Sequence, residues 1–176
     1  MTSDVRCNTC DIYPTLLDIT GVSVEGQCPL DGVSLLPLLE GEMDARPQPM
    51  GFWDCPIGGI GTPSDAWMAE LLAAQQEGRE GELDQGKLRL DAAEIKQQYS
   101  LTSFPGHSAW IDGDWKLHRI EPKEDGNVRL ELYNLADDPM ETTDLLDSET
   151  ERVVEMSKSL EGWLESVARS LNGEDY

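Results

Sequence analysis

The most restrictive feature of this sequence is the stretch GHSAWIDGDWKLHRI at residues 106–120, where two strand-like segments flank the dipeptide Asp112-Gly113. An Asp-Gly dipeptide between two such segments favours a type I′ turn, because both central residues of that turn need positive φ. The pattern therefore predicts a β-hairpin with strands at residues 107–112 and 115–120.

Side chains alternate between the two faces of a strand, so this hairpin has an apolar face and a basic face. With a two-residue turn, Trp110 lies opposite Trp115, and both share a face that we expect to pack on the core. In the same register His107 lies opposite His118. His107, Lys116 and His118 share the other face, and we take them as candidate substrate-binding residues. A solvated sheet face covered by long basic side chains is the simpler alternative.

Two further segments and a long helix complete the predicted fold. Residues 130–135 fit a third strand, and the apolar segment MGFW at residues 50–53 fits a fourth. Residues 148–171 predict a long helix that begins with a capping box of Ser148 and Glu151. Its apolar residues recur at helical spacing: Val153, Met156, Leu160, Trp163, Val167 and Leu171. We therefore expect an α+β fold, in which a small antiparallel sheet of three to four strands packs on the long C-terminal helix.

Two short helices precede the predicted sheet. The segment DIYPTLLDITG has Asp11 to cap its first turn and Gly21 to end it. The segment SLLPLLEG repeats this pattern, with Ser34 as its cap and Gly41 as its stop. The first helix has much apolar surface for its length, so we expect it to pack on a partner.

A third helix is predicted to begin at Thr62-Pro63, with Trp67, Leu71 and Leu72 buried. The residues after it, at about 77–100, are mostly polar and predict an insertion that is partly helical over residues 91–98.

The charge of the chain argues against polyanionic partners. Lys plus Arg total 13 against 35 Asp plus Glu among 176 residues, which gives a formal net charge of −22. Such a field repels nucleic-acid phosphates and anionic headgroups, so we expect no nucleic-acid partner and no membrane partner. The opening residues MTSDVRCNTC hold no apolar run, so we expect no secretory signal there.

The sequence offers no complete catalytic or metal-binding constellation. Cys7 and Cys10 form a C-x-x-C pair, but the second pair that a structural zinc site needs is absent, so ordinary thiols are favoured. Nucleophilic catalysis needs an activated nucleophile, a base and an oxyanion donor, and the two histidines supply at most the base. We therefore predict no catalytic residue and no metal ligand in this chain.

Several segments occur together in an order that resembles one protein family. They are DIYPTLLDITG, PLDGVSLLPLLEG, the GDWKL hairpin, and ELYNLADDPMETTDL before the final helix. Their order and spacing resemble the C-terminal part of the formylglycine-dependent sulfatases, which are sulfuric ester hydrolases related to alkaline phosphatase. The resemblance covers nearly the whole chain. The C-x-P-S-R motif from which the family makes its formylglycine does not occur in this sequence.

The resemblance implies a division of the chain and a set of partners. Residues 1–41 would be the end of the family's large α/β domain with its connecting helices, and residues 42–176 the small C-terminal subdomain. That subdomain would pack on the large N-terminal domain and help to shape a pocket for a sulfated carbohydrate or an aryl sulfate. Calcium and formylglycine would belong to the large domain, so this chain alone would hold no cofactor and be inactive.

An alternative stays open beside the resemblance. The chain would then be a free-standing acidic, non-catalytic binding or interaction module with the same small fold. Bacterial members of the sulfatase family are often periplasmic or secreted, and the sequence leaves the location of this chain open.

Overall fold

The computed structural model of this chain describes residues 2–54, 64–79, 98–122 and 126–174. Its elements follow in the order η1 (Thr9–Asp11, a 3-10 turn), α1 (Ile12–Thr20), α2 (Leu36–Glu40), β1 (Met50–Asp54), α3 (Ser64–Gln76), β2 (Gly106–Asp112), β3 (Trp115–Glu121), β4 (Arg129–Asn134) and α4 (Thr150–Leu171). None of the helices in these described ranges is long and apolar enough to cross a membrane.

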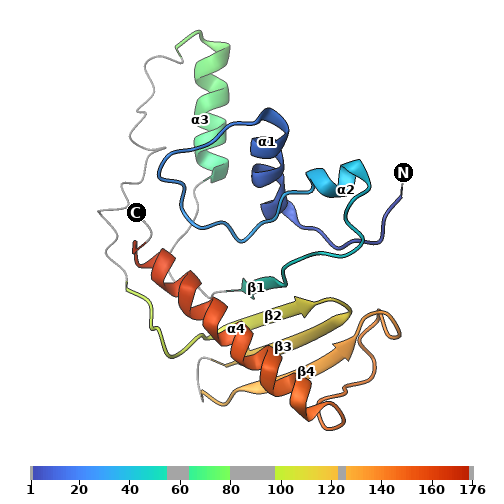
Figure 1. Ribbon diagram of the computed structural model, residues 1–176. Helices are drawn as coiled ribbons and strands as arrows, with labels where there is room; N and C mark the ends of the chain where they lie inside the picture. Colours follow the sequence, from blue (N-terminus) through green and yellow to red (C-terminus); the bar gives the residue numbers. More distant parts are fainter. Residues whose placement is uncertain (1, 55–63, 80–97, 123–125, 175–176) are drawn as a thin grey trace.

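The four strands form one antiparallel sheet in the order β1-β2-β3-β4, and α4 crosses one of its faces (Figure 1). Leu117 of β3 and Leu132 of β4 are fully buried in one core with Leu160 and Leu164 of α4. Each such side chain contributes about 1.5–3 kcal/mol through its removal from water. The predicted α+β fold, with a small antiparallel sheet packed on a long C-terminal helix, is confirmed, and MGFW is indeed the fourth strand.

The hairpin turn differs from the prediction by one position. Asp112 pairs with Trp115, so Gly113 and Asp114 occupy the two central positions of the turn. Gly113 has a φ of 55°. A type II′ turn needs positive φ only at its first central position, which glycine adopts at little cost. The predicted type I′ turn over Asp112-Gly113 is therefore wrong, because Asp112 is paired within the strand and Gly113 alone of the turn residues has positive φ.

Helix α4 lacks the predicted capping box. Its N-cap residue is Glu149, which makes no side-chain capping bond. Ser148 donates its hydroxyl hydrogen to the carbonyl oxygen of Leu145 instead, at 3.0 Å. The buried stripe of α4 is formed by Met156, Leu160, Leu164 and Ala168. Met156 and Leu160 belong to the predicted stripe, whereas Val153, Trp163 and Val167 flank it and are half-buried.

The N-terminal segment is tied to the start of β1 by a buried ion pair. Asn8 caps the first turn, because its side chain accepts from the N–H of Cys10 at 2.8 Å. The carboxylate of Asp11 accepts two hydrogen bonds from Arg46, at 2.6 and 2.9 Å, and one from the N–H of Val33 at 2.9 Å. Asp11 is fully buried. Asp11 occupies the predicted N-cap position of α1, but its side chain makes no capping bond to that helix. Its carboxylate accepts from the N–H of Asn8 at 2.8 Å, which completes a capping box one turn earlier, and from Arg46 and Val33.

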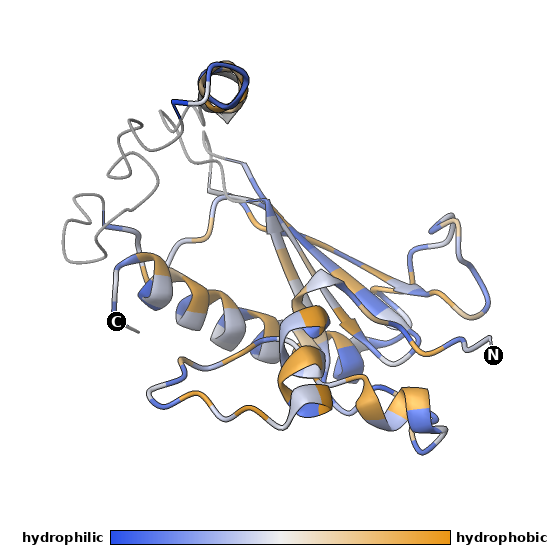
Figure 2. Cartoon of the chain, turned by 90° about the horizontal axis from the view of Figure 1, so that it is seen from above, coloured by the Kyte–Doolittle hydropathy of each residue, from blue (hydrophilic) through white to orange (hydrophobic). Residues whose placement is uncertain are grey.

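The predicted ends of the two short helices are confirmed. Gly21 and Gly41 follow α1 and α2 in the left-handed conformation, and their N–H groups bond carbonyl oxygens of the last helical turn. The N-cap residue of α2 is Leu35, not the predicted Ser34. Ser34 lies one position earlier, and its hydroxyl oxygen accepts from the N–H of Leu36 at 3.2 Å. Figure 2 shows that α1 and α2 are rich in hydrophobic residues.

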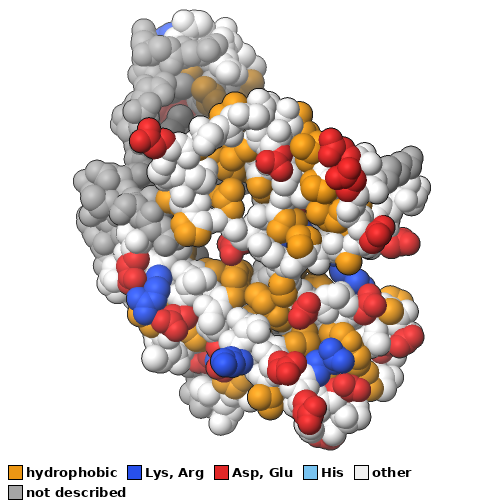
Figure 3. Space-filling view, viewed as in Figure 1, with side chains coloured by type: hydrophobic (Ala, Val, Ile, Leu, Met, Phe, Trp, Pro, Cys, Tyr) orange, Lys and Arg blue, Asp and Glu red, His pale blue; other side chains and the backbone are white. Residues whose placement is uncertain are grey.

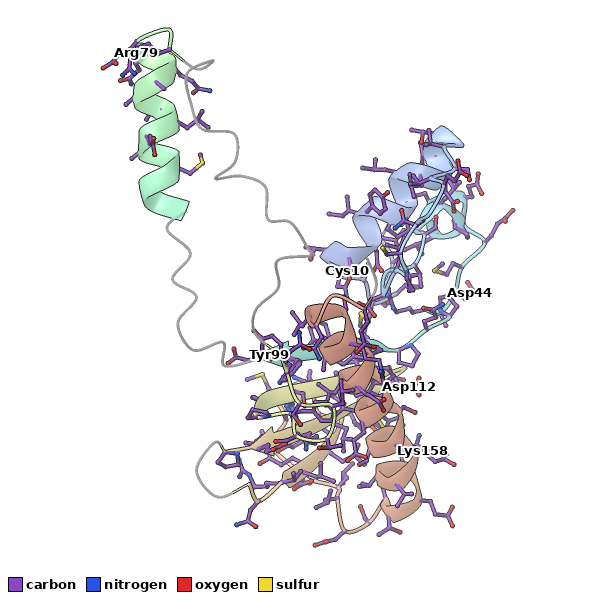
Figure 4. All side chains as sticks on the ribbon, turned by 90° about the vertical axis from the view of Figure 1, so that its left-hand side faces the viewer. Cys10, Asp44, Arg79, Tyr99, Asp112 and Lys158 are labelled. Atoms are coloured by element: carbon purple, nitrogen blue, oxygen red, sulfur yellow. The ribbon has the colours of Figure 1, made fainter. Side chains whose placement is uncertain are left out.

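Helix α3 stands away from the sheet in each view of the ribbon (Figures 1, 2 and 4). Leu72 was predicted to be buried, but its side chain is 56% exposed, because α3 does not lie against the core. The predicted helix start at Thr62-Pro63, the side chain of Trp67 and most of residues 91–98 lie outside the described residues.

Most of the predicted insertion at about 77–100 lies outside the described residues, and Tyr99, labelled in Figure 4, stands near the start of the next described range. The N–H of Tyr99 donates to the side chain of Asn172 at 2.6 Å, and its carbonyl oxygen accepts from the same side chain at 3.1 Å. The end of α4 therefore fixes the point from which the chain enters β2.

Candidate functional site

The three predicted site residues lie together on the open face of the sheet, opposite α4. The observed register sets His107 opposite Ile120, and Ala109 opposite His118. The turn has moved by one residue, which shifts each cross-strand partner by two positions. An even shift leaves every side chain on its predicted face, because side chains alternate with a period of two. His107, Lys116 and His118 therefore share one face despite the error in the register.

A continuous chain of hydrogen bonds joins these residues through Glu141. His107 Nε2 lies 2.7 Å from His118 Nδ1, and His118 Nε2 lies 2.7 Å from Glu141 Oε2. Lys116 Nζ donates to Glu141 Oε1 at 2.6 Å. His118 is buried with 7% exposure, whereas His107 is exposed at the end of the chain of bonds. The arrangement therefore links one solvent-facing imidazole to a half-buried carboxylate.

Glu141 reaches the open face from the connection between β4 and α4. Its φ of 56° makes it the single non-glycine residue with positive φ in the described ranges. Such a conformation costs on the order of 1–3 kcal/mol and persists only where surrounding contacts hold it. Asp138 supplies part of that support, since its carboxylate accepts from the N–H groups of Thr142 and Thr143 at 2.7 and 2.8 Å. The two bonds from Lys116 and His118 to the Glu141 side chain supply the rest.

Burial and the charge of Lys116 favour the neutral form of His118. Burial lowers the pKa of His118 below its ordinary value; the hydrogen bond to Glu141 opposes this, and the charge of Lys116 adds to it. Burial alone would raise the pKa of Glu141, but the hydrogen bonds from Lys116 and His118 outweigh it, so the pKa of Glu141 is lowered. Glu141 is therefore a carboxylate, and it balances the charge of Lys116.

The protonation of these two groups fixes the direction of the hydrogen bonds. A carboxylate can only accept, so His118 donates from Nε2 to Glu141. The Nδ1 of a neutral His118 then holds a lone pair and accepts from Nε2 of His107. In a neutral His107 the remaining nitrogen, Nδ1, is consequently an acceptor.

A hollow of about 370 Å³ lies on this face of the sheet. Its apolar lining comes from Phe52 of β1 and from Ala109 and Ile111 of β2, with His107, Ser108, Lys116 and His118 beside them. Asp54 also lines the hollow, and it is the cross-strand neighbour of His107. The volume is within the range of small-ligand pockets, about 300–1,000 Å³.

The hollow can hold a ligand and exchange a proton with it, but it holds no activated nucleophile. Ser108 is the one hydroxyl residue of its lining, and its hydroxyl donates to the carbonyl oxygen of Arg119 at 3.3 Å. Across the described ranges, no group of three or more His, Cys, Asp or Glu side chains is arranged to hold a metal ion. Cys7 and Cys10 are exposed and form no disulfide.

Glu141 is the residue of the site that sequence reasoning missed. It lies within ELYNLADDPMETTDL, one of the segments that carry the resemblance to sulfatases. The Asp-Asp-Pro run before it predicts a turn, but a turn does not reveal that the side chain after it crosses back to β3. A long-range pairing of this kind leaves no local signal.

No protein-family model matches this chain, and a search of curated proteins finds no match either.

Proposed function

We propose that this chain is the C-terminal subdomain of a formylglycine-dependent sulfatase, in which the open face of its sheet forms one wall of the substrate pocket. The observation that carries the proposal is the hollow with His107, Lys116 and His118, held by Glu141 on the face that α4 leaves open. The motif order supports the same family, and the observed fold is the one that the resemblance implies.

The exposed apolar side chains of α1 are evidence for a large partner domain. Ile12, Leu16 and Ile19 of α1 are 56%, 54% and 53% exposed. Three large apolar side chains on one short helix favour a covering surface, because short helices gain most of their stability from tertiary packing. The large N-terminal sulfatase domain would supply this surface, together with the calcium and the formylglycine. Sulfated carbohydrates or aryl sulfates would be the substrates.

The second candidate is a free-standing binding module, and it is favoured by a hydrophobic core that this chain buries without a second domain. Leu117, Leu132, Leu160 and Leu164 are fully buried by residues of this chain. The sheet and α4 therefore have a core of their own and do not need a second domain to bury it. Figure 3 shows acidic side chains spread over one face of the molecule, which would keep such a module soluble.

Capture of the native protein from its source cells tests the proposal. An antibody against residues 98–122 isolates the polypeptide, and mass spectrometry measures its length and searches for a formylglycine-containing peptide. We expect a longer polypeptide that carries formylglycine and hydrolyses 4-nitrophenyl sulfate in the presence of calcium. A native polypeptide of this length without sulfatase activity would overturn the proposal and leave the binding module.

A further inference from the structure

The hollow on the open face has an aromatic floor at one side. Phe52 is 42% exposed, although it belongs to a strand of the sheet. It pairs across the strands with Ala109, and Asp54 pairs with His107. An exposed ring, a small buried residue and two polar side chains therefore lie next to one another on two adjacent strands. A ligand in the hollow would have Phe52, Asp54 and His107 around it, because all three line it.

The polar atoms at this end of the hollow are acceptors. The carboxylate of Asp54 can only accept hydrogen bonds. The hydrogen-bond chain through His118 to Glu141 uses Nε2 of His107 as a donor, which leaves Nδ1 of a neutral His107 as an acceptor. The ammonium group of Lys116 is engaged by Glu141. The hollow is thus complementary to a ligand that presents hydroxyl donors at its edge.

The charges around the hollow disfavour an anion. Lys116 contributes one positive charge on this face, and Glu141 and Asp54 contribute one negative charge each. The local sum is negative, and the formal net charge of the whole chain is −22. A sulfate group would therefore be repelled from this hollow, whereas an uncharged polar ligand would not.

We propose that this hollow binds the uncharged sugar ring of a carbohydrate, not its sulfate group. One C–H face of the ring lies on Phe52, and ring hydroxyls donate to Asp54 and to Nδ1 of His107. The inference rests on the proposed function for its place in a sulfatase pocket, where the sulfate would lie in the large domain. If this site binds a sugar ring, the substrates of the proposed sulfatase are sulfated carbohydrates rather than aryl sulfates.

Titration of the purified chain with sugars, followed by amide chemical shifts, tests this inference. The probes are neutral disaccharides of glucose, galactose and N-acetylglucosamine, the same disaccharides with one sulfate ester, and 4-nitrophenyl sulfate. We expect at least one neutral disaccharide to shift the amides of Phe52, Asp54, His107 and Ala109, and its sulfate ester to bind no more tightly. Tighter binding of the sulfate esters at these amides would overturn the inference, as would the absence of any shift with all neutral probes.

Variants separate a specific site from weak surface contact. Phe52→Ala should weaken binding of the neutral disaccharide about tenfold, because it removes the stacking surface. Asp54→Asn should also weaken it, whereas Asp112→Asn, the same change at an exposed strand position away from the hollow, should not. Equal affinities for the two Asn variants would overturn the assigned contacts. Phe52 is 42% exposed and does not belong to the buried core, so its replacement leaves that core intact.

The two proposals can fail separately. A native protein with formylglycine whose C-terminal chain binds no neutral sugar would refute the sugar site and leave the sulfatase proposal. A chain that binds neutral sugars, in a native protein without formylglycine, would refute the sulfatase proposal and leave a carbohydrate-binding module.

Discussion

Replacement of Gly51 by alanine tests how α4 packs on β1. A Cβ at position 51 would lie 2.6 Å from Cε3 of Trp163 and closer still to two other atoms of that ring. Carbon atoms in favourable contact are about 3.5–4.0 Å apart, so the ring or the strand must move by roughly 1 Å. The ring has little freedom to move. Its Nε1 donates to Asp31 at 3.0 Å, and its centroid lies 6.1 Å from that of Trp110.

The sign of the change in the free energy of unfolding tells whether Gly51→Ala creates a clash with Trp163. Overpacking of a core costs about 1–3 kcal/mol. Without a clash, alanine would instead stabilise a strand by about 0.5–1 kcal/mol relative to glycine. We therefore expect Gly51→Ala to lower the free energy of unfolding by about 1–2 kcal/mol in urea titrations followed by circular dichroism. A Gly51→Ala protein as stable as the original would refute this account of the packing.

Two further variants make the test specific. Gly162 lies on the exposed side of α4, and nothing lies within 4 Å of a Cβ added there. Gly162→Ala should therefore stabilise the protein by up to about 1 kcal/mol through helix propensity alone. In a Trp163→Leu background, Gly51→Ala should lose most of its cost, and a double-mutant cycle measures this coupling.

Three other perturbations follow from the buried charges and from the missing nucleophile. Arg46→Met leaves the buried carboxylate of Asp11 unpaired, which should cost about 3–5 kcal/mol, or all of the local stability of the N-terminal segment where that is smaller. The amide hydrogen of Val33 should then exchange with solvent much faster. The amides of α4 should keep their exchange rates and serve as the internal control. The pKa values of Asp11, Glu121 and Glu141 are all lowered, because hydrogen bonds outweigh burial, so the native state binds fewer protons than the unfolded state. The free energy of unfolding should therefore fall as the pH drops below the ordinary carboxyl pKa values of 4.5 for glutamate and 3.8 for aspartate. The lowered pKa of His118 adds a loss of stability that begins below the ordinary histidine pKa of 6.5. Urea midpoints that stay constant in acid would contradict this prediction. The purified chain should not hydrolyse 4-nitrophenyl sulfate with calcium present, and turnover that survives repurification would contradict this prediction.

The sequence predicted those parts of the fold in which apolar residues recur at a regular spacing. Alternation in the strands and the apolar stripe of the last helix identified the sheet, α4 and the face that each residue occupies. The assignment of faces tolerated an error in the turn, because an even shift in register does not move a side chain to the other face. The turn itself was less predictable, since it depends on whether Gly113 occupies the first or the second central position.

The cap at Asp11 and the site depended on contacts between distant residues. Asp11 has the residue type and position of a helix cap, but its carboxylate is bound by Arg46, 35 residues away. Ser148 fails as a cap for a local reason, because its hydroxyl bonds the carbonyl oxygen of Leu145. Glu141 bonds residues of β3 that lie 23 and 25 residues before it. Local patterns identified His107, Lys116 and His118 as one surface. They did not predict that Glu141 would balance the charge of Lys116.

The connection between β1 and β2 has a consequence for the order of folding. β2 and β3 are joined by a two-residue turn, whereas residues 55–105 separate β1 from its partner β2. Loop-closure entropy grows as about (3/2)RT ln n, so closing a loop of about 50 residues costs roughly 3 kcal/mol more than closing one of about two. We therefore expect β2, β3 and β4 to assemble with α4 in the transition state and β1 to join afterwards. Mutations in β1 should then change the unfolding rate, whereas mutations of Leu117 should slow folding, and variation in the length of residues 55–105 should alter stability without altering the register of the sheet.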